Sequence, residues 1–320
     1  MSTQKTKPEL TPLALQHLKV CFMSHFSVLV IGADHKAQLA PYHKFECTGE
    51  NDQYVQDVDI TAEIQAMIDE GKTLDDALGY HGLEDKVAES LDEIDIEGDD
   101  CEHKYGYAIV KDGKLIKAVN RTNPNRKWDW YQVGGRWSGF LKLKAGGTGG
   151  NGKRGWMNRN DVIEAGYCDQ AKKGDIDFDA MRDEKGAKAA ATWDKAYSLH
   201  HGQTWETWPA MRKRLGVEEA RKQYHEQPAI QAMRKDDDLR WHDSLDVFMQ
   251  SRDEFIQAAR DRAIVTFAVV KDSKWYENGE MGWWACVGNE KDQNDWNRQF
   301  NELLDGLPDD TVLTVVDCHI

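Results

Sequence analysis

The sequence has no long apolar run and few prolines. Its 320 residues include only 7 Pro. No stretch of about 18 apolar residues occurs, so we expect no transmembrane helix. The polar residues Gln16, His17 and Lys19 interrupt the apolar stretch 13–23, which makes a poor signal-peptide core. These absences predict a cytoplasmic protein.

The 6 cysteines are scattered, and no CxxC pair occurs. A chain of this length can bury its core without disulfides, so we predict reduced thiols. A zinc site can be assembled on paper from residues with metal-binding side chains: His43, Cys47, Cys101, His103, Cys318 and His319. These residues are close in sequence only in pairs, and no pair has the spacing of a zinc finger. We therefore predict no metal and no cofactor.

Motifs of catalysis are missing as well. GxSxG, HExxH and the protein-kinase set do not occur. The stretch 147–153 matches the first part of a phosphate-binding P-loop, but Arg154 stands where Mg²⁺ chemistry needs a Ser or Thr hydroxyl. With 56 Asp and Glu, spacing cannot single out or exclude a pair of catalytic carboxylates. No pattern establishes an activity, and we predict a protein that is not an enzyme.

Charge is present in excess and is unevenly distributed. The formal net charge is −15, but residues 50–102 hold 19 Asp/Glu and only Lys72 and Lys86, a local net charge of −17. Residues 103–165 hold 13 Lys/Arg against four acidic residues, a local net charge of +9. The acidic block can pair with a basic partner, imitate nucleic acid, or simply be a solvated helical face.

The N-terminal half mixes strand and helix signals. An apolar run predicts a buried strand at 26–31. Cap residues and apolar spacing predict helices that begin at Thr61 and after Thr73, and a further helix over 83–96. Residues 105–119 predict a hairpin around Asp112-Gly113, and 267–275 is a near copy, which favours related sheet elements. Further strands at 130–133 and 137–143 are followed by a flexible glycine loop at 146–152.

The signals from 175 to 262 are helical, and strands return afterwards. Helices are predicted over 187–199, 210–227, 229–235, 239–262 and 291–304, and strands over 264–270, 281–287 and 311–320. The pattern predicts an α+β protein with three parts. They are an N-terminal extension (1–22), a mixed α/β core from both chain ends (23–170 and 261–320), and a charged helical arm inserted between them (171–260).

The most unusual segment is 123–139, which is rich in Trp, Gly and Arg. Its candidate binding residues are Trp128, Asp129, Trp130, Tyr131, Gly134, Gly135, Arg136 and Trp137. Tryptophans can stack on a base while Arg126, Lys127 and Arg136 hold phosphate. The same residues also suit a structural corner with a Gly-Gly turn, or a protein-binding face. In the arm, Trp205, Trp208 and Trp241 lie among charges and are predicted to be exposed partner contacts.

Several segments are similar to a family of uncharacterised bacteriophage and prophage proteins. They are 26–32 with 38–43, 45–49, 128–131 with 134–137, and 296–300 through 314–320. The layout further resembles the phage anti-Gabija inhibitors, which have an α/β shoulder and a helical arm. These assemble around a host defence nuclease complex and block its access to DNA.

The resemblance implies a phage-encoded, non-enzymatic inhibitor in the host cytoplasm. It would bind a host antiviral complex and form homo-oligomers, without contacting a membrane or nucleic acid directly. Two other readings stay open. One is a nucleotide-binding or nucleotide-modifying protein that uses 123–139, and the other is a phage structural or accessory factor.

Overall fold

The structure is a computed structural model that describes residues 25–44, 50–97, 101–154, 164–281 and 286–320. The predicted N-terminal extension 1–22 lies outside these residues. Helices and strands gather in separate, mixed sheets, so the prediction of an α+β fold is confirmed. No helix in the described ranges is long and apolar enough to cross a membrane.

Both ends of the chain supply the centre of the main sheet. Strand β1 (His25–Ile31) pairs antiparallel with β16 (Val312–His319) and parallel with β12 (Ala268–Lys271). The strand order is β13-β12-β1-β16-β11-β8, and β6 pairs with both β16 and β9. The outer strands are β13 (Lys274–Glu277), β11 (Gln170–Lys172), β8 (Gly149–Gly150), β6 (Trp130–Gly135) and β9 (Lys153–Arg154).

The two faces of the main sheet are covered by different helices. Side chains alternate across a strand, so Leu29 of β1 packs with Phe300 of α10 (Gln293–Asp305) on one face. Val28 and Val30 face the other way and pack with Leu39 of the short helix α2 (His35–Leu39). Burial on both faces explains the unbroken apolar run at 26–31.

Residues 50–122 form a small lobe with a sheet of its own, in the order β2-β5-β4-β3. Its strands are β2 (Gln56–Asp59), β5 (Lys114–Thr122), β4 (Gly106–Lys111) and β3 (Val87–Ala88), with helices α3 (Thr61–Asp69) and α4 (Leu74–Tyr80). Ile64 and Leu78 from the two helices fill a separate core. The predicted core of 23–170 and 261–320 is thus divided between two sheets.

The hairpin prediction in the small lobe is correct, and the helix prediction beside it is wrong. Strands β4 and β5 meet at Asp112 and Gly113, both with positive φ. The segment 83–96 is not a helix, because Val87–Ala88 pairs with β4 as a sheet edge and only Leu91–Glu93 makes a 3-10 turn. Because this segment pairs with β4, the apolar helix face that its residue spacing suggested does not form.

The second hairpin also exists, but in the other sheet. Strands β12 and β13 turn at Asp272-Ser273, again with positive φ at both positions. The repeated sequence therefore specifies the same kind of turn in two hairpins that belong to different sheets. The predicted strand 137–143 is reduced to β7 (Leu141–Lys142), which pairs with β10 (Tyr167–Cys168). The predicted glycine loop contains β8, which pairs with β11.

The helical arm is a long hairpin that carries three short helices at its tip. Helix α5 (Phe178–His200) runs out and packs along α9 (Arg252–Asp261), which returns. Between them lie α6 (Trp208–Leu215), α7 (Val217–Glu226) and α8 (Pro228–Arg234). Gly216, with φ of 76°, divides the helix predicted over 210–227. Only α9 and the 3-10 turns Leu239–Trp241 and Asp246–Met249 form from the helix predicted over 239–262.

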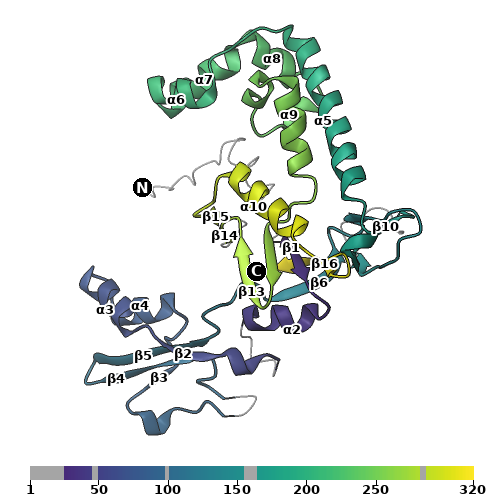
Figure 1. Cartoon of the computed structure of the whole chain (residues 1–320). Coiled ribbons are helices and arrows are strands. Elements are labelled where there is room, and N and C mark those ends of the chain that lie inside the picture. Colours follow the sequence, from purple (N-terminus) through teal and green to yellow (C-terminus); the bar gives the residue numbers. More distant parts are fainter. Residues whose placement is uncertain (1–24, 45–49, 98–100, 155–163, 282–285) are drawn as a thin grey trace, which may run out of the picture.

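The arm and the small lobe extend away from opposite sides of the main sheet (Figure 1). The arm has its own core, which includes Ile230, Met233 and Phe248. The short strands β14 (Glu280–Met281) and β15 (Val287–Gly288) pair antiparallel and come between β13 and α10 in the chain order. The molecule is therefore a central sheet with two separately packed appendages.

Candidate functional site

Two of the tryptophans in the segment 123–139 are structural. Trp128 is only 5% exposed, stacks on His43 at a ring-centroid distance of 4.3 Å, and donates from Nε1 to the Leu39 carbonyl oxygen at 3.1 Å. Trp137 packs against the core beneath α10. Tyr131 packs on the face of the main sheet that α2 covers, and its ring meets that of Trp128 edge-on. The prediction that Trp128 stacks on a base is therefore wrong, because both faces of the ring are inside the fold.

The Gly-Gly turn makes room for two buried carboxylates. Gly134 and Gly135 have φ of 77° and 53°, and side chains there would overlap Asp169 and Asp317. Asp169 accepts hydrogen bonds from the amides of Gly139 at 2.6 Å and Gly152 at 2.8 Å. Glycine is thus required by the carboxylates that hold the loop, and not by a close-lying nucleotide.

A pair of histidines lies at the end of the main sheet beside this turn. His25 Nδ1 is 2.7 Å from Asp317 Oδ1, and His319 Nδ1 is 2.7 Å from Asp129 Oδ1. The second oxygen of Asp317 accepts the Arg136 amide at 2.9 Å. The ring centroids of the two histidines are 4.9 Å apart.

Sequence reasoning assigned no role to His25 and considered His319 only as a zinc ligand. A signal was available in β16, where every second residue lies on the same side of the strand. Leu313 and Val315 on that side are apolar, but Asp317 and His319 follow them. An acidic residue in a buried strand is costly unless it is hydrogen-bonded, so its presence points to a partner.

The basic residues of the segment differ in their availability. Lys127 Nζ forms an ion pair with Glu277 at 2.6 Å, and Arg126 donates to Thr122 Oγ1 at 3.3 Å. Arg136 keeps Nε and one terminal nitrogen buried, without a hydrogen-bond partner in the part of the chain that the structure describes. Of the three predicted phosphate-binding residues, Arg136 is the one that keeps buried donors unused.

Of the tryptophans predicted to bind a ligand or partner, Trp130 and Trp241 are exposed. Trp130 is 48% exposed beside His25, and Trp241 is 69% exposed under the Arg240 guanidinium. The prediction that Trp205 is an exposed partner contact is wrong. It is 8% exposed and donates from Nε1 to Asp246 at 2.8 Å, because it closes the core of the arm. Trp208 packs partly buried against the same core.

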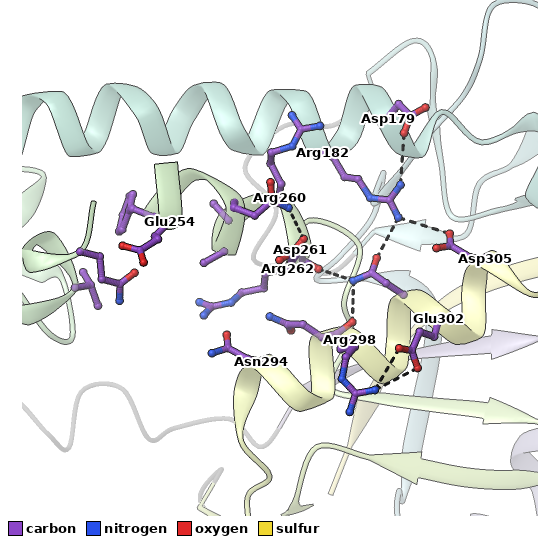
Figure 2. A pocket seen from close by; sticks show the side chains of 18 of the residues that line it. Asp179, Arg182, Glu254, Arg260, Asp261, Arg262, Asn294, Arg298, Glu302 and Asp305 are labelled. Atoms are coloured by element: carbon purple, nitrogen blue, oxygen red, sulfur yellow. Dashed lines mark hydrogen bonds and ion pairs between the residues drawn. The ribbon is translucent and has the colours of Figure 1, made fainter. Parts of the chain in front are cut away.

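A cavity of about 1180 Å³ lies where the arm joins the main sheet, between α5, α9 and α10. Figure 2 shows that its walls carry charges of both signs, many already paired, such as Arg182 with Asp179 and Arg298 with Glu302. None of the residues predicted from the sequence lines it. Balanced, paired charge gives this cavity no preference for an anion or a cation.

The surface of the small lobe combines carboxylates with exposed apolar side chains. Residues 50–122 carry 20 Asp/Glu against seven Lys/Arg, a net charge of −13. Five large apolar side chains of the lobe are exposed: Tyr80, Val87, Leu91, Tyr105 and Ile116. Scattered single apolar residues are ordinary on a surface, but this lobe is small and holds about half of those exposed in the described chain.

No family model, curated protein or solved structure matches this chain. Within the described ranges, no group of three or more His, Cys, Asp or Glu is arranged to hold a metal ion. Cys168, Cys286 and Cys318 are free thiols, whereas Cys21 and Cys47 lie outside the described residues. Functional arguments therefore rest on the surfaces and side-chain clusters described above.

Proposed function

We propose that the protein is a phage-encoded inhibitor that binds a host antiviral nuclease complex and blocks it without catalysis. The observation that carries the proposal is the small lobe, which has a net charge of −13 and five exposed apolar side chains around a core of its own. A lobe that only completed the main sheet would not need a separate core or such a surface.

Charge complementarity gives the lobe a defined kind of partner. Proteins that bind DNA present cationic grooves, because most of their affinity comes from contacts with phosphates. An acidic lobe is attracted to such a groove and competes with DNA for it. Tyr80, which is 74% exposed, and Leu91 supply the apolar anchors that provide most of the affinity in protein interfaces.

The arm supplies a second contact at a distance from the first. Its exposed Trp241 lies among charged residues shortly after α8, and the arm extends from the side of the main sheet opposite the small lobe (Figure 1). A molecule with two separate contacts can span two subunits of a complex and gains avidity from doing so. Self-association, which the resemblance implies, would multiply these contacts further.

The lobe is tested by the double variant Tyr80→Ser/Leu91→Ser. We expect loss of co-purification with the host nuclease complex and loss of protection of the phage, with an unchanged melting temperature, because both side chains are solvent-exposed. Tyr276→Ser is the matched control, since Tyr276 is a comparably exposed aromatic on β13 of the main sheet. A double variant that binds and protects like the control would refute the lobe as the contact surface.

The arm is tested by deletion. Gly186 of α5 lies against Ile256 and Arg260 of α9, so the two helices are close enough there to be joined by a short Gly/Ser linker. Replacing 187–255 should leave a cooperatively melting protein, because the arm has its own core. We expect this protein to inhibit less than the full chain. Full inhibition by a folded deletion would leave the small lobe as the contact surface.

A further inference from the structure

The main sheet carries a polar patch where its apolar face ends. On neighbouring strands β1, β16 and β6, His25 is in register with His319, and His319 with Trp130. One step further into the sheet, Asp317 is in register with Ser27 and with Gln132. Side chains on one face repeat every second residue, so the two rows lie together on the side that α10 covers further along.

The two histidines are held in the same way and leave the same atom free. Each Nδ1 is bonded to a carboxylate, which fixes the tautomer and the orientation of the ring. Neither Nε2 makes a hydrogen bond in the described part of the chain. Two oriented imidazole rings therefore lie next to each other, and the side chain of His25 is 10% exposed while that of His319 is 38% exposed.

A purely structural role accounts for only part of this arrangement. The carboxylate of Asp317 is almost fully buried and already anchors the Gly-Gly turn through the Arg136 amide. Orienting His25 with the other oxygen is not needed to hold that turn. A second Asp–His pair on the next strand repeats the arrangement without burial of the ring, since the His319 side chain is 38% exposed.

The surroundings favour an anionic ligand with an aromatic part. The basic stretch of the sequence, 103–165, supplies β6 and the adjacent β9, where Lys153 is exposed. The Arg136 side chain begins at the amide bonded to Asp317, and its buried nitrogens lack partners in the described chain. Trp130 offers an exposed ring next to His25. Protonated imidazoles and guanidinium groups donate charge-assisted hydrogen bonds to phosphate, and tryptophan stacks on bases.

We propose that His25 and His319 form a binding site for the phosphate ester of a nucleotide, with the base stacked on Trp130. Both rings bind the phosphate as imidazolium ions, in which Nδ1–H donates to the carboxylate and Nε2–H donates to a phosphate oxygen, and Arg136 adds positive charge. Asp317 and Asp129 act as positioning residues. The ligand is either a free mononucleotide or a nucleotide within a single strand. The site lies on the main sheet and is independent of the small lobe.

The test uses the full chain with four probes: AMP, adenosine, inorganic phosphate and a short single-stranded DNA. Calorimetry measures binding, and long-range ¹H–¹⁵N spectra of the imidazole rings report the contact. We expect AMP to shift the ring signals of His25 and His319, and His319→Gln to weaken AMP binding by about tenfold or more. Trp130→Ala should remove the preference for AMP over phosphate. Tighter binding of the DNA would identify a strand as the source of the nucleotide.

His201→Asn is the control, because His201 is an exposed histidine in the left-handed conformation that asparagine also adopts. Asp317→Asn should weaken AMP binding and broaden the His25 signals, which loss of a merely structural contact would not do selectively. His319→Gln avoids the folding risk of the more buried His25. The proposal is overturned if AMP and the DNA both fail to bind, or if His319→Gln binds AMP like His201→Asn.

Discussion

Asp246 holds the tip of the arm together, and its removal should be costly. Its Oδ1 accepts hydrogen bonds from Trp205 Nε1 at 2.8 Å and from the Tyr224 hydroxyl at 2.7 Å. Its Oδ2 accepts from the Trp208 amide at 2.8 Å. One carboxylate thus connects the start of α6, the end of α7 and the turn before α9. Burial, followed by the bond to Asp246, raises the pKa of Tyr224, so its hydroxyl stays protonated and donates.

Asp246→Ala would leave these three donors without an acceptor. Trp205 and Tyr224 are buried, and an unsatisfied buried donor costs about 1–3 kcal/mol. The losses share one network and do not simply add. We expect the free energy of unfolding of the arm to fall by about 3–5 kcal/mol. Asp246→Asn keeps one acceptor oxygen and should lose about half as much.

Hydrogen exchange read by mass spectrometry reports on the arm separately from the main sheet. Amides of α6 and α7 should exchange more than about 100-fold faster in Asp246→Ala, while those of β1 and β16 stay unchanged. Asp243→Ala is the matched control, because Asp243 is an exposed aspartate nearby with no hydrogen bond or ion pair in the described chain. If the two variants exchange alike, the network does not stabilise the arm. Tyr224→Phe should increase the exchange rates less in the Asp246→Ala background than in the wild type, because the hydrogen bond to Asp246 is already lost there.

Three further predictions concern single side chains. In urea denaturation, the buried Trp128→Ala should lower the free energy of unfolding by about 3–5 kcal/mol and the exposed Trp130→Ala by less than about 1 kcal/mol. Equal losses would contradict this difference in burial between the two rings. Burial lowers the pKa of His200 in the folded protein, so the free energy of unfolding is highest above about pH 6.5 and falls at lower pH, where the unfolded chain binds the proton more readily. His200→Leu should flatten this pH dependence in melts from pH 5 to 8. Burial raises the pKa of Cys168 to about 11, so iodoacetamide at pH 8 should modify the exposed Cys286 far sooner, and comparable peptide-level labelling would argue against this burial.

The local elements with strong signals can be predicted from the residues alone. The run 26–31 is apolar throughout because β1 is buried on both faces, and this is visible without a structure. The turn Asp112-Gly113 tolerates positive φ and so specifies a hairpin. The α+β class follows from the mixture of such elements. Charge polarity along the chain is also a property of the sequence, and the acidic block 50–102 belongs to the small lobe, although its charge did not show that this part has a core of its own.

Which side chains meet depends on the folded arrangement of the strands. Val87 belongs to a strand because β4 offers an edge to pair with, although the local spacing favoured a helix. Trp128 and Trp130 are two residues apart and look equivalent in the sequence, yet one is buried against His43 and the other is exposed beside His25. The histidine pair joins residues 294 positions apart, through the pairing of the first and last described strands. Contacts between such distant residues depend on strand order and register, and local residue patterns do not encode either.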